Sequence, residues 1–266
     1  MFDYLYRISD IKLFILLTLV SVTLSLIAIF LVRRFIPVNL RYIDNQVIGN
    51  TISLVSVLYG VLAGLAALYL INNNSYASDA VQREANSIAN IFRDTRSLKE
   101  PARTSIQTEV KQYIDTVINI EWPLMRKGAH IDHEGDTIID NIADEINNYY
   151  VIGESESRLV RDLLEENKSL YNSRQQRITM SYASLDIEIW IVILIGTILT
   201  MSINYLFGMN FYLHMVTVIA AAIMTSSMIF LLITLDRPFQ GEFIIEPVAL
   251  KSVLHFIEDH PSEAPS

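Results

Sequence analysis

The sequence predicts an all-α membrane protein with four transmembrane helices and a helical soluble domain inserted between the second and the third. Of its 266 residues, 52% are hydrophobic, and they are concentrated in three long blocks that contain no charged residue. These blocks are Leu13 to Val32, Asn45 to Ser78 and Ile189 to Leu235. Between the last two blocks, prolines are rare and apolar residues recur at helical spacing, which favours helices over strands.

The first two blocks predict an N-terminal membrane part at residues 1–72. A helix needs about 20 apolar residues to cross the hydrocarbon core of a bilayer. We therefore expect one transmembrane helix at 11–32 and a second at 47–71. The first is not a convincing signal peptide, because it ends at Arg33-Arg34 and no small-residue cleavage site follows.

The third block predicts a C-terminal membrane part at residues 188–241. It is long enough for two more transmembrane helices, at 188–206 and 211–235, joined by a tight turn from Tyr205 to Asn210. An exit turn follows the fourth helix, and residues 242–266 form a C-terminal tail.

The soluble domain, residues 73–187, is expected to share helices with the membrane parts. Apolar residues continue beyond the second membrane helix in steps of three or four, and no helix breaker interrupts them. They are Ala77, Val81, Ala85, Ile88 and Phe92. This pattern predicts one helix from residue 47 to about residue 94. A helix that begins at about residue 155 is likewise expected to run into the third membrane helix.

Two further helices are expected inside the soluble domain. Pro101 suits the first turn of a helix, and an apolar stripe follows it. This helix should end or kink at Glu121-Trp122-Pro123, where the proline interrupts the hydrogen-bond ladder. A short helix is expected at about 137–150, opened by Asp136.

The charge distribution bears on partners and orientation. The net charge is −9, and residues 73–187 carry 13 basic and 19 acidic residues, which argues against nucleic acid as a partner. With four spans, both termini and the soluble domain share one side of the lipid bilayer. The opposite loop holds Arg33, Arg34 and Arg41, fewer cations than flank the spans on the other side. The positive-inside rule therefore places the termini and the soluble domain in the cytoplasm.

Motifs typical of enzymes are absent from the sequence. It contains no phosphate-binding glycine loop, no H-E-x-x-H and no G-x-S-x-G. The stretch "HIDHEGD" (130–136) offers metal-ligand residue types, but Thr137 occupies the position where a calcium loop needs glycine. There is no cysteine either. We expect no catalytic residue, no metal and no cofactor.

Small residues form a stripe down the second membrane helix. The stripe includes Ser53, Ser56, Gly60, Ala63 or Gly64, and Ala67. Close packing between helices is the simpler interpretation, because small residues let helix backbones approach in lipid. The alternative is a pore-lining face, where small residues leave an aqueous path.

Asn74, with Asn72 and Asn73, marks the end of this membrane segment. Three neutral polar side chains fit a plain transition from membrane to water. In an oligomer, a ring of Asn74 side chains is an alternative site for permeating ions.

The end of the fourth membrane helix is a candidate structural clamp. Asp236 and Arg237 follow the longest uncharged block, and Pro238, Phe239 and Gly241 then turn the chain. Glu84 borders an apolar helix face, where an unpaired carboxylate is costly. Arg237 is one possible partner for it, and a solvated Glu84 is the simpler alternative.

Four stretches resemble a bacterial membrane protein family of uncharacterised function that is classed as bestrophin-like. They are "GNTISLVSVLYGVLAGL" (49–65) with "ASDAVQREANSIANIFRDTRSL" (77–98), "YIDTVINIEWPLM" (113–125), "LDRPFQG" (235–241) and "IEPVAL" (245–250). The resemblance implies a multi-pass protein of the bacterial inner (plasma) membrane.

A more distant resemblance links "PFQG" to the Pro-Phe-Gly turn of bestrophins. Bestrophins are pentameric ion channels whose second span lines a hydrophobic neck, so the resemblance implies a homo-oligomer, with five copies by analogy. Two departures stand out: small residues dominate the candidate neck face, and no acidic run follows Gly241.

The leading functional hypothesis is a homo-oligomeric ion channel with a path lined by the second membrane helix. Because the soluble domain is acidic, it should concentrate cations, which favours monovalent inorganic cations as the permeating ions. The alternative is a non-conducting membrane scaffold or sensor whose helical stalk recruits a partner.

Overall fold

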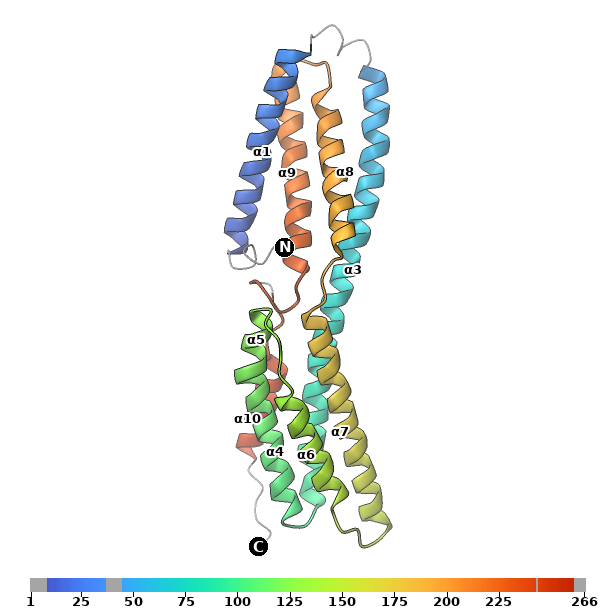
Figure 1. Ribbon diagram of the computed structural model, residues 1–266, viewed down its shortest axis with the longest axis vertical. Helices are drawn as coiled ribbons and strands as arrows, with labels where there is room; N and C mark the ends of the chain where they lie inside the picture. The colour runs from blue at the N-terminus through green and yellow to red at the C-terminus, as the bar shows by residue number, and fades with distance from the viewer. Residues whose placement is uncertain (1–8, 37–44, 243, 261–266) are drawn as a thin grey trace. The chain divides into compact units, whose positions relative to one another are not determined.

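The computed structural model describes residues 9–36, 45–242 and 244–260 (Figure 1). Arg41, which contributed to the predicted orientation, lies outside this range. Within the described ranges every regular element is a helix, and the chain divides into two units. One unit holds the chain up to Asn72 with Ser184–Arg237. The other holds Asn73–Ala183, Pro238–Gln240 and the chain from Ile244 onward.

Four helices are long and apolar enough to cross a membrane. They are α1 (Asp10–Phe35), α3 (Asn45–Asp94), α8 (Ile187–Tyr205) and α9 (Phe211–Leu235). The four predicted helices are thus present as candidate membrane spans, and the continuation of the second one to residue 94 is confirmed. The segment of α3 beyond Asn72 belongs to the second unit.

The membrane unit is held by packing between its helices. α1 lies along α9 (Figure 1), and Leu13 and Leu232 are buried in the shared core. The Tyr59 ring of α3 lies directly against Gly196 of α8. A Cβ added at Gly196 would lie only 2.6 Å from a carbon of that ring. Any larger residue at this position would therefore force the Tyr59 ring to move.

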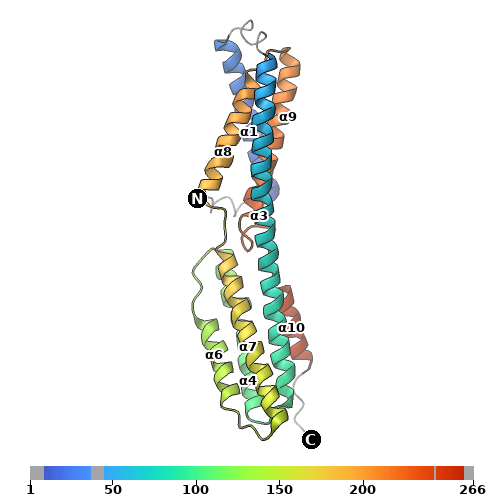
Figure 2. The same cartoon turned by 90° about the vertical axis from the view of Figure 1, so that its right-hand side faces the viewer.

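The second unit, which we call the soluble unit after the domain that the sequence predicts there, is a helical bundle that includes the C-terminal part of α3 (Figure 2). Its other helices are α4 (Ala102–Thr116), α5 (Trp122–Arg126), α6 (Glu134–Asn147), α7 (Glu154–Ser181) and α10 (Val248–Asp259), with the 3₁₀ turn η2 (Thr95–Ser97). The predicted tail therefore contains a helix, α10, which buries Leu250 and Ile257 in the core of this unit. α6 begins at Glu134, slightly before the predicted start.

The kink predicted at Glu121-Trp122-Pro123 takes the form of a π-helical turn. α4 passes into η3 (Val117–Glu121), which leads directly into α5. Pro123 has no N–H to donate to the ladder, and a wider turn accommodates that loss. The turn also places Glu121 inside the bundle, where it is 2% exposed.

The prediction that α7 runs into the third membrane helix is wrong. α7 ends at Ser181, and α8 begins at Ile187 after an extended Asp186. The physical reason lies at the end of α9, where a carboxylate oxygen of Asp236 accepts a 2.6 Å hydrogen bond from the backbone N–H of Leu185. An N–H that bonds to a side chain is not available to a continuous helix.

Replacing Asp236 with Ala should therefore loosen the entry into α8. The charge-assisted bond to a buried N–H is lost, and we expect destabilisation of about 1–3 kcal/mol. Denaturation of the purified protein in detergent would measure it. Asp236→Asn keeps an acceptor oxygen and is the matched control, so equal loss in both variants would contradict this role.

Candidate functional site

The membrane segment of α3 has one face packed inside the protomer and one face open. Ala63, Ala66, Ala67 and Leu70 are buried at 7% exposure or less. Ser53, Gly60 and Gly64 are exposed, and a Cβ at either glycine would meet no atom within 4 Å.

This division corrects the predicted stripe of small residues. Ala63 and Ala67 pack against the protomer's own helices and are not available to line a path between copies. Gly60 and Gly64, in contrast, lie on the exposed face, and Ser56 is half-buried. Steps of three and four residues fit both the buried face and the exposed face beside it. The spacing alone therefore could not show which small residues are buried.

The open face of α3 forms a continuous stripe in steps of three or four residues. We call it the open stripe: Ser53, Val57, Gly60, Gly64, Leu68, Ile71, Ser75 and Ser78, all of which are exposed. The stripe begins and ends with hydroxyl groups and carries larger apolar side chains in the middle. Asn74 is half-buried beside it.

Sequence reasoning missed the larger members of the open stripe. The sequence pattern on the opposite face of α3 could have identified them. There, Ala77, Val81 and Ala85 continue the row of buried residues that includes Ala66 and Leu70. If that row is extended toward the N-terminus at helical spacing, Val57, Leu68 and Ile71 fall on the other side of the helix and are expected to point outward.

The soluble unit contains a buried cluster of ionised side chains, which we call the ion cluster. Arg177 of α7 is fully buried and donates to both carboxylate oxygens of Glu84, at 2.6 and 2.9 Å. It also donates to Glu121 of the π turn at 2.6 Å. Arg174 donates to the other oxygen of Glu121 at 2.7 Å and also pairs with Asp136 of α6.

Neutral groups complete the ion cluster. The hydroxyl of Tyr113, from α4, donates to Glu84 at 2.6 Å. The guanidinium of Arg177 lies 5.5 Å from the centre of the Trp122 ring and contacts the sulfur of Met125. Helices α3, α4, α6 and α7 and the π turn thus all contribute to one hydrogen-bonded network.

The surroundings raise the pKa values of two members of the cluster, Arg177 and Tyr113. Burial alone would lower the pKa of Arg177, but the carboxylates of Glu84 and Glu121 raise this pKa well above its ordinary value. Burial, reinforced by the charge of Glu84, raises the pKa of the Tyr113 hydroxyl well above its ordinary value. Both side chains therefore keep their protons at physiological pH.

The ion cluster corrects the suggested pairing of Glu84 with Arg237. Both oxygens of Glu84 are occupied by Arg177 and Tyr113, and the carboxylate is 0% exposed. Neither Arg237 nor solvent is needed to stabilise it. The sequence did not indicate Arg177 as the partner of Glu84, because the two residues are 93 positions apart and meet only through tertiary packing.

The other clamp candidates have separate local roles. Asp236 bonds to Leu185. The carbonyl of Pro238 accepts a 3.0 Å hydrogen bond from the N–H of Ile245. Phe239 is 1% exposed and packs edge-on against Trp122, with ring centres 5.6 Å apart. Gly241 has a φ of 105°, a conformation that favours glycine.

Comparison with known proteins identifies the family. A sequence model described as the Bestrophin-like domain matches residues 19–250. A bacterial bestrophin homolog from Klebsiella pneumoniae aligns with a TM-score of 0.69 and 11% identity, over 94% of this chain and 99% of that chain. A structure described only as a membrane protein aligns with a TM-score of 0.70 and 12% identity, also over 94% and 99%. At these identities the likeness shows a shared fold. A search of curated proteins gives no match.

Replacing Arg177 with Met should strongly destabilise the protein. The change leaves the buried Glu84 without its guanidinium partner and Glu121 with Arg174 alone, which costs about 3–5 kcal/mol. The double variant Glu84→Gln with Arg177→Met should lose clearly less than the sum of the single variants, because fewer charges remain unpaired. Denaturation in detergent micelles measures all three.

The matched control for that cycle is Arg158→Met. Arg158 pairs with Glu154 on the surface, with exposed fractions of 65% and 80%, so its loss should cost less than about 1 kcal/mol. Additive effects of the Glu84 and Arg177 variants would show that the ion cluster does not act as a unit.

The raised pKa of Tyr113 predicts a loss of stability in alkaline solution. In the unfolded chain this hydroxyl ionises near pH 10, whereas the folded protein keeps the proton. Its contribution is complete below pH 10 and is lost as pH rises above that, by at most about 1.4 kcal/mol per pH unit.

Tyr113→Phe should lose stability at pH 8 and should show a shallower decline between pH 10 and 11. Tyr150→Phe, at an 81% exposed position, is the control and should follow the wild type. An equally steep alkaline decline in Tyr113→Phe would contradict the assignment.

Proposed function

This chain belongs to the bestrophin-like family, and from that premise we propose that it forms a homo-oligomeric ion channel whose conduction path is lined by the open stripe of α3. The observation that carries the proposal is the pair Gly60 and Gly64, exposed and with open space where side chains would stand. Copies of α3 around a common axis would place these glycines along the path.

The arrangement of side chains along the open stripe suits gated conduction. Ser53, Ser75 and Ser78 offer hydroxyl oxygens to a passing ion, as pore linings do. Leu68 and Ile71, exposed at 53% and 47%, would form the apolar constriction that closes by dewetting. This assigns the neck to larger side chains than those expected from the sequence.

Monovalent cations are the permeating ions that the charge distribution favours. The segment 73–187 carries six more acidic than basic residues, the difference between 19 and 13. Arg174 and Arg177 are buried in ion pairs with Glu121 and Glu84, and leaving these four residues out of the count keeps the acidic excess at six. The resulting surface concentrates cations and repels anions.

Recording from the purified protein in planar bilayers tests the proposal. We expect channel currents whose reversal potential in a KCl gradient moves toward the K⁺ equilibrium value. Gly64→Ile should reduce conductance, because a side chain would enter the path, and Leu68→Ala should increase it. The control is Ile198→Ala, at a 63% exposed position of α8.

Thiol accessibility distinguishes the channel from the alternative, a non-conducting scaffold or sensor. The chain has no native cysteine, so a single introduced thiol is the only target. A water-soluble thiol reagent should modify Gly64→Cys and block current, and should leave Ala63→Cys unmodified because that position is 1% exposed. A stable oligomer that carries no current and protects Gly64→Cys would favour the scaffold.

A further inference from the structure

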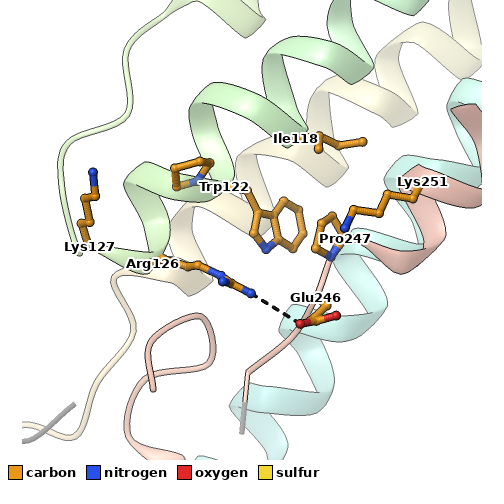
Figure 3. Close-up of a pocket in the computed structure, with 8 residues that line it drawn as sticks. Ile118, Trp122, Arg126, Lys127, Glu246, Pro247 and Lys251 are labelled. Carbon is orange, nitrogen blue, oxygen red and sulfur yellow. Dashed lines mark hydrogen bonds and ion pairs between the residues drawn. The ribbon is translucent and has the colours of Figure 1, made fainter. Parts of the chain in front are cut away.

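A pocket of about 340 Å³ lies in the soluble unit between the π turn, α5 and the start of α10 (Figure 3). Its walls are apolar, formed by Ile118, Trp122, Pro123 and Pro247. This volume falls at the lower end of the range of small-molecule sites, about 300–1,000 Å³. The pocket takes no part in the proposed conduction path, which lies on the open stripe.

Three cations surround this pocket in a protein that is acidic overall. Arg126, Lys127 and Lys251 line it, and Glu246 is the one carboxylate among the lining residues. The Arg126–Glu246 contact is long, at 3.5 Å, and both side chains are about half exposed. Among the described residues, neither lysine forms an ion pair. The rim therefore carries a net positive charge that its own carboxylate does not neutralise.

The indole nitrogen of Trp122 is a second, independent feature of the pocket. Trp122 is 3% exposed, and its N–H has no hydrogen-bond partner among the described residues. Figure 3 shows this nitrogen on the side of the ring that faces the Arg126 head group. A buried donor without an acceptor is costly. A ligand oxygen at this position would accept a hydrogen bond that no protein atom accepts, and this bond would favour binding.

The pocket is also rigid where the ligand would bind. The Trp122 ring packs edge-on against Phe239 and lies 5.5 Å from the buried guanidinium of Arg177. Pro123 and Pro247 fix the backbone at two walls. Such preorganisation lowers the entropy that a ligand loses on binding.

We propose that this pocket binds a small organic oxyanion with an apolar body, such as an aromatic carboxylate. The oxyanion would accept from the Trp122 N–H, Arg126 and Lys251, and the apolar body would lie against Ile118 and the prolines. Cationic ligands would face three positive side chains, and inorganic anions would leave the apolar walls uncovered.

Tryptophan fluorescence and ligand-observed ¹⁹F NMR would test the site on the full-length protein in neutral detergent. The chain has two tryptophans, so Trp190→Phe leaves Trp122 as the only indole. 4-Fluorophenylacetate should change Trp122 emission saturably and broaden its own ¹⁹F signal. The neutral amide of the same compound should bind at least about tenfold more weakly, because the charge-assisted bonds are lost.

Three variants make the test specific. Lys251→Gln should weaken binding about tenfold or more. Glu246→Gln should strengthen it, because the competing carboxylate for Arg126 is removed. Lys111→Gln, an exposed lysine on α4 outside the pocket, should leave affinity unchanged.

The same probe distinguishes a free metabolite from a lipid headgroup as the source of the oxyanion. Displacement of the probe by short-chain phosphatidylglycerol, but not by phosphatidylcholine, would support the site with lipid as its source. No displacement by either would support a free carboxylate. The proposal is overturned if the acid and the amide bind equally, if Lys251→Gln and Lys111→Gln behave alike, or if no saturable binding occurs.

Discussion

The fully buried guanidinium of Arg177 is the constraint on which the soluble unit depends. Removing an isolated charge from water costs far more than any single contact returns, so its position requires compensation from all sides. Glu84, Glu121 and the face of Trp122 supply that compensation. Each comes from a different element, and each must keep its place for the charge to remain buried. The ion cluster thus fixes the rotation of α3, the π turn and the packing of α7 together.

The buried positions of α3 follow one helical spacing in the soluble unit and in the membrane unit. Glu84 faces inward, and counting back by three and four residues places Val81, Ala77, Leu70 and Ala66 on the inward side as well. The opposite side, including Gly60 and Gly64, is therefore directed away from the protomer's own core.

Hydrophobic blocks and periodicity were sufficient to predict the four membrane helices and the unbroken α3, because length and apolar content alone determine them. The break before α8 was not predictable, because it depends on Asp236 reaching Leu185 across 51 positions of sequence. Arg177 was equally hidden, since it lies in a polar stretch with Arg174, Gln175 and Gln176, which is typical of a solvent-exposed helix. The stripe of small residues was visible in the sequence. That Ala63 is buried and Gly64 exposed could not be predicted, because it depends on which face of α3 packs against other helices.

The two exposed glycines of α3 are the strongest indication that this face has a function beyond the single chain. Glycine costs a helix about 1 kcal/mol relative to alanine, and the small residues buried on the inward face of the membrane segment, Ala63, Ala66 and Ala67, are alanines. At Gly196 the cost is offset by contact with Tyr59, whereas Gly60 and Gly64 have no neighbour in their own protomer within 4 Å of an added Cβ. In the proposed channel, the compensation for Gly60 and Gly64 comes from a second α3 at close distance or from a path that a side chain would obstruct. Both arrangements belong to the homo-oligomer that we propose.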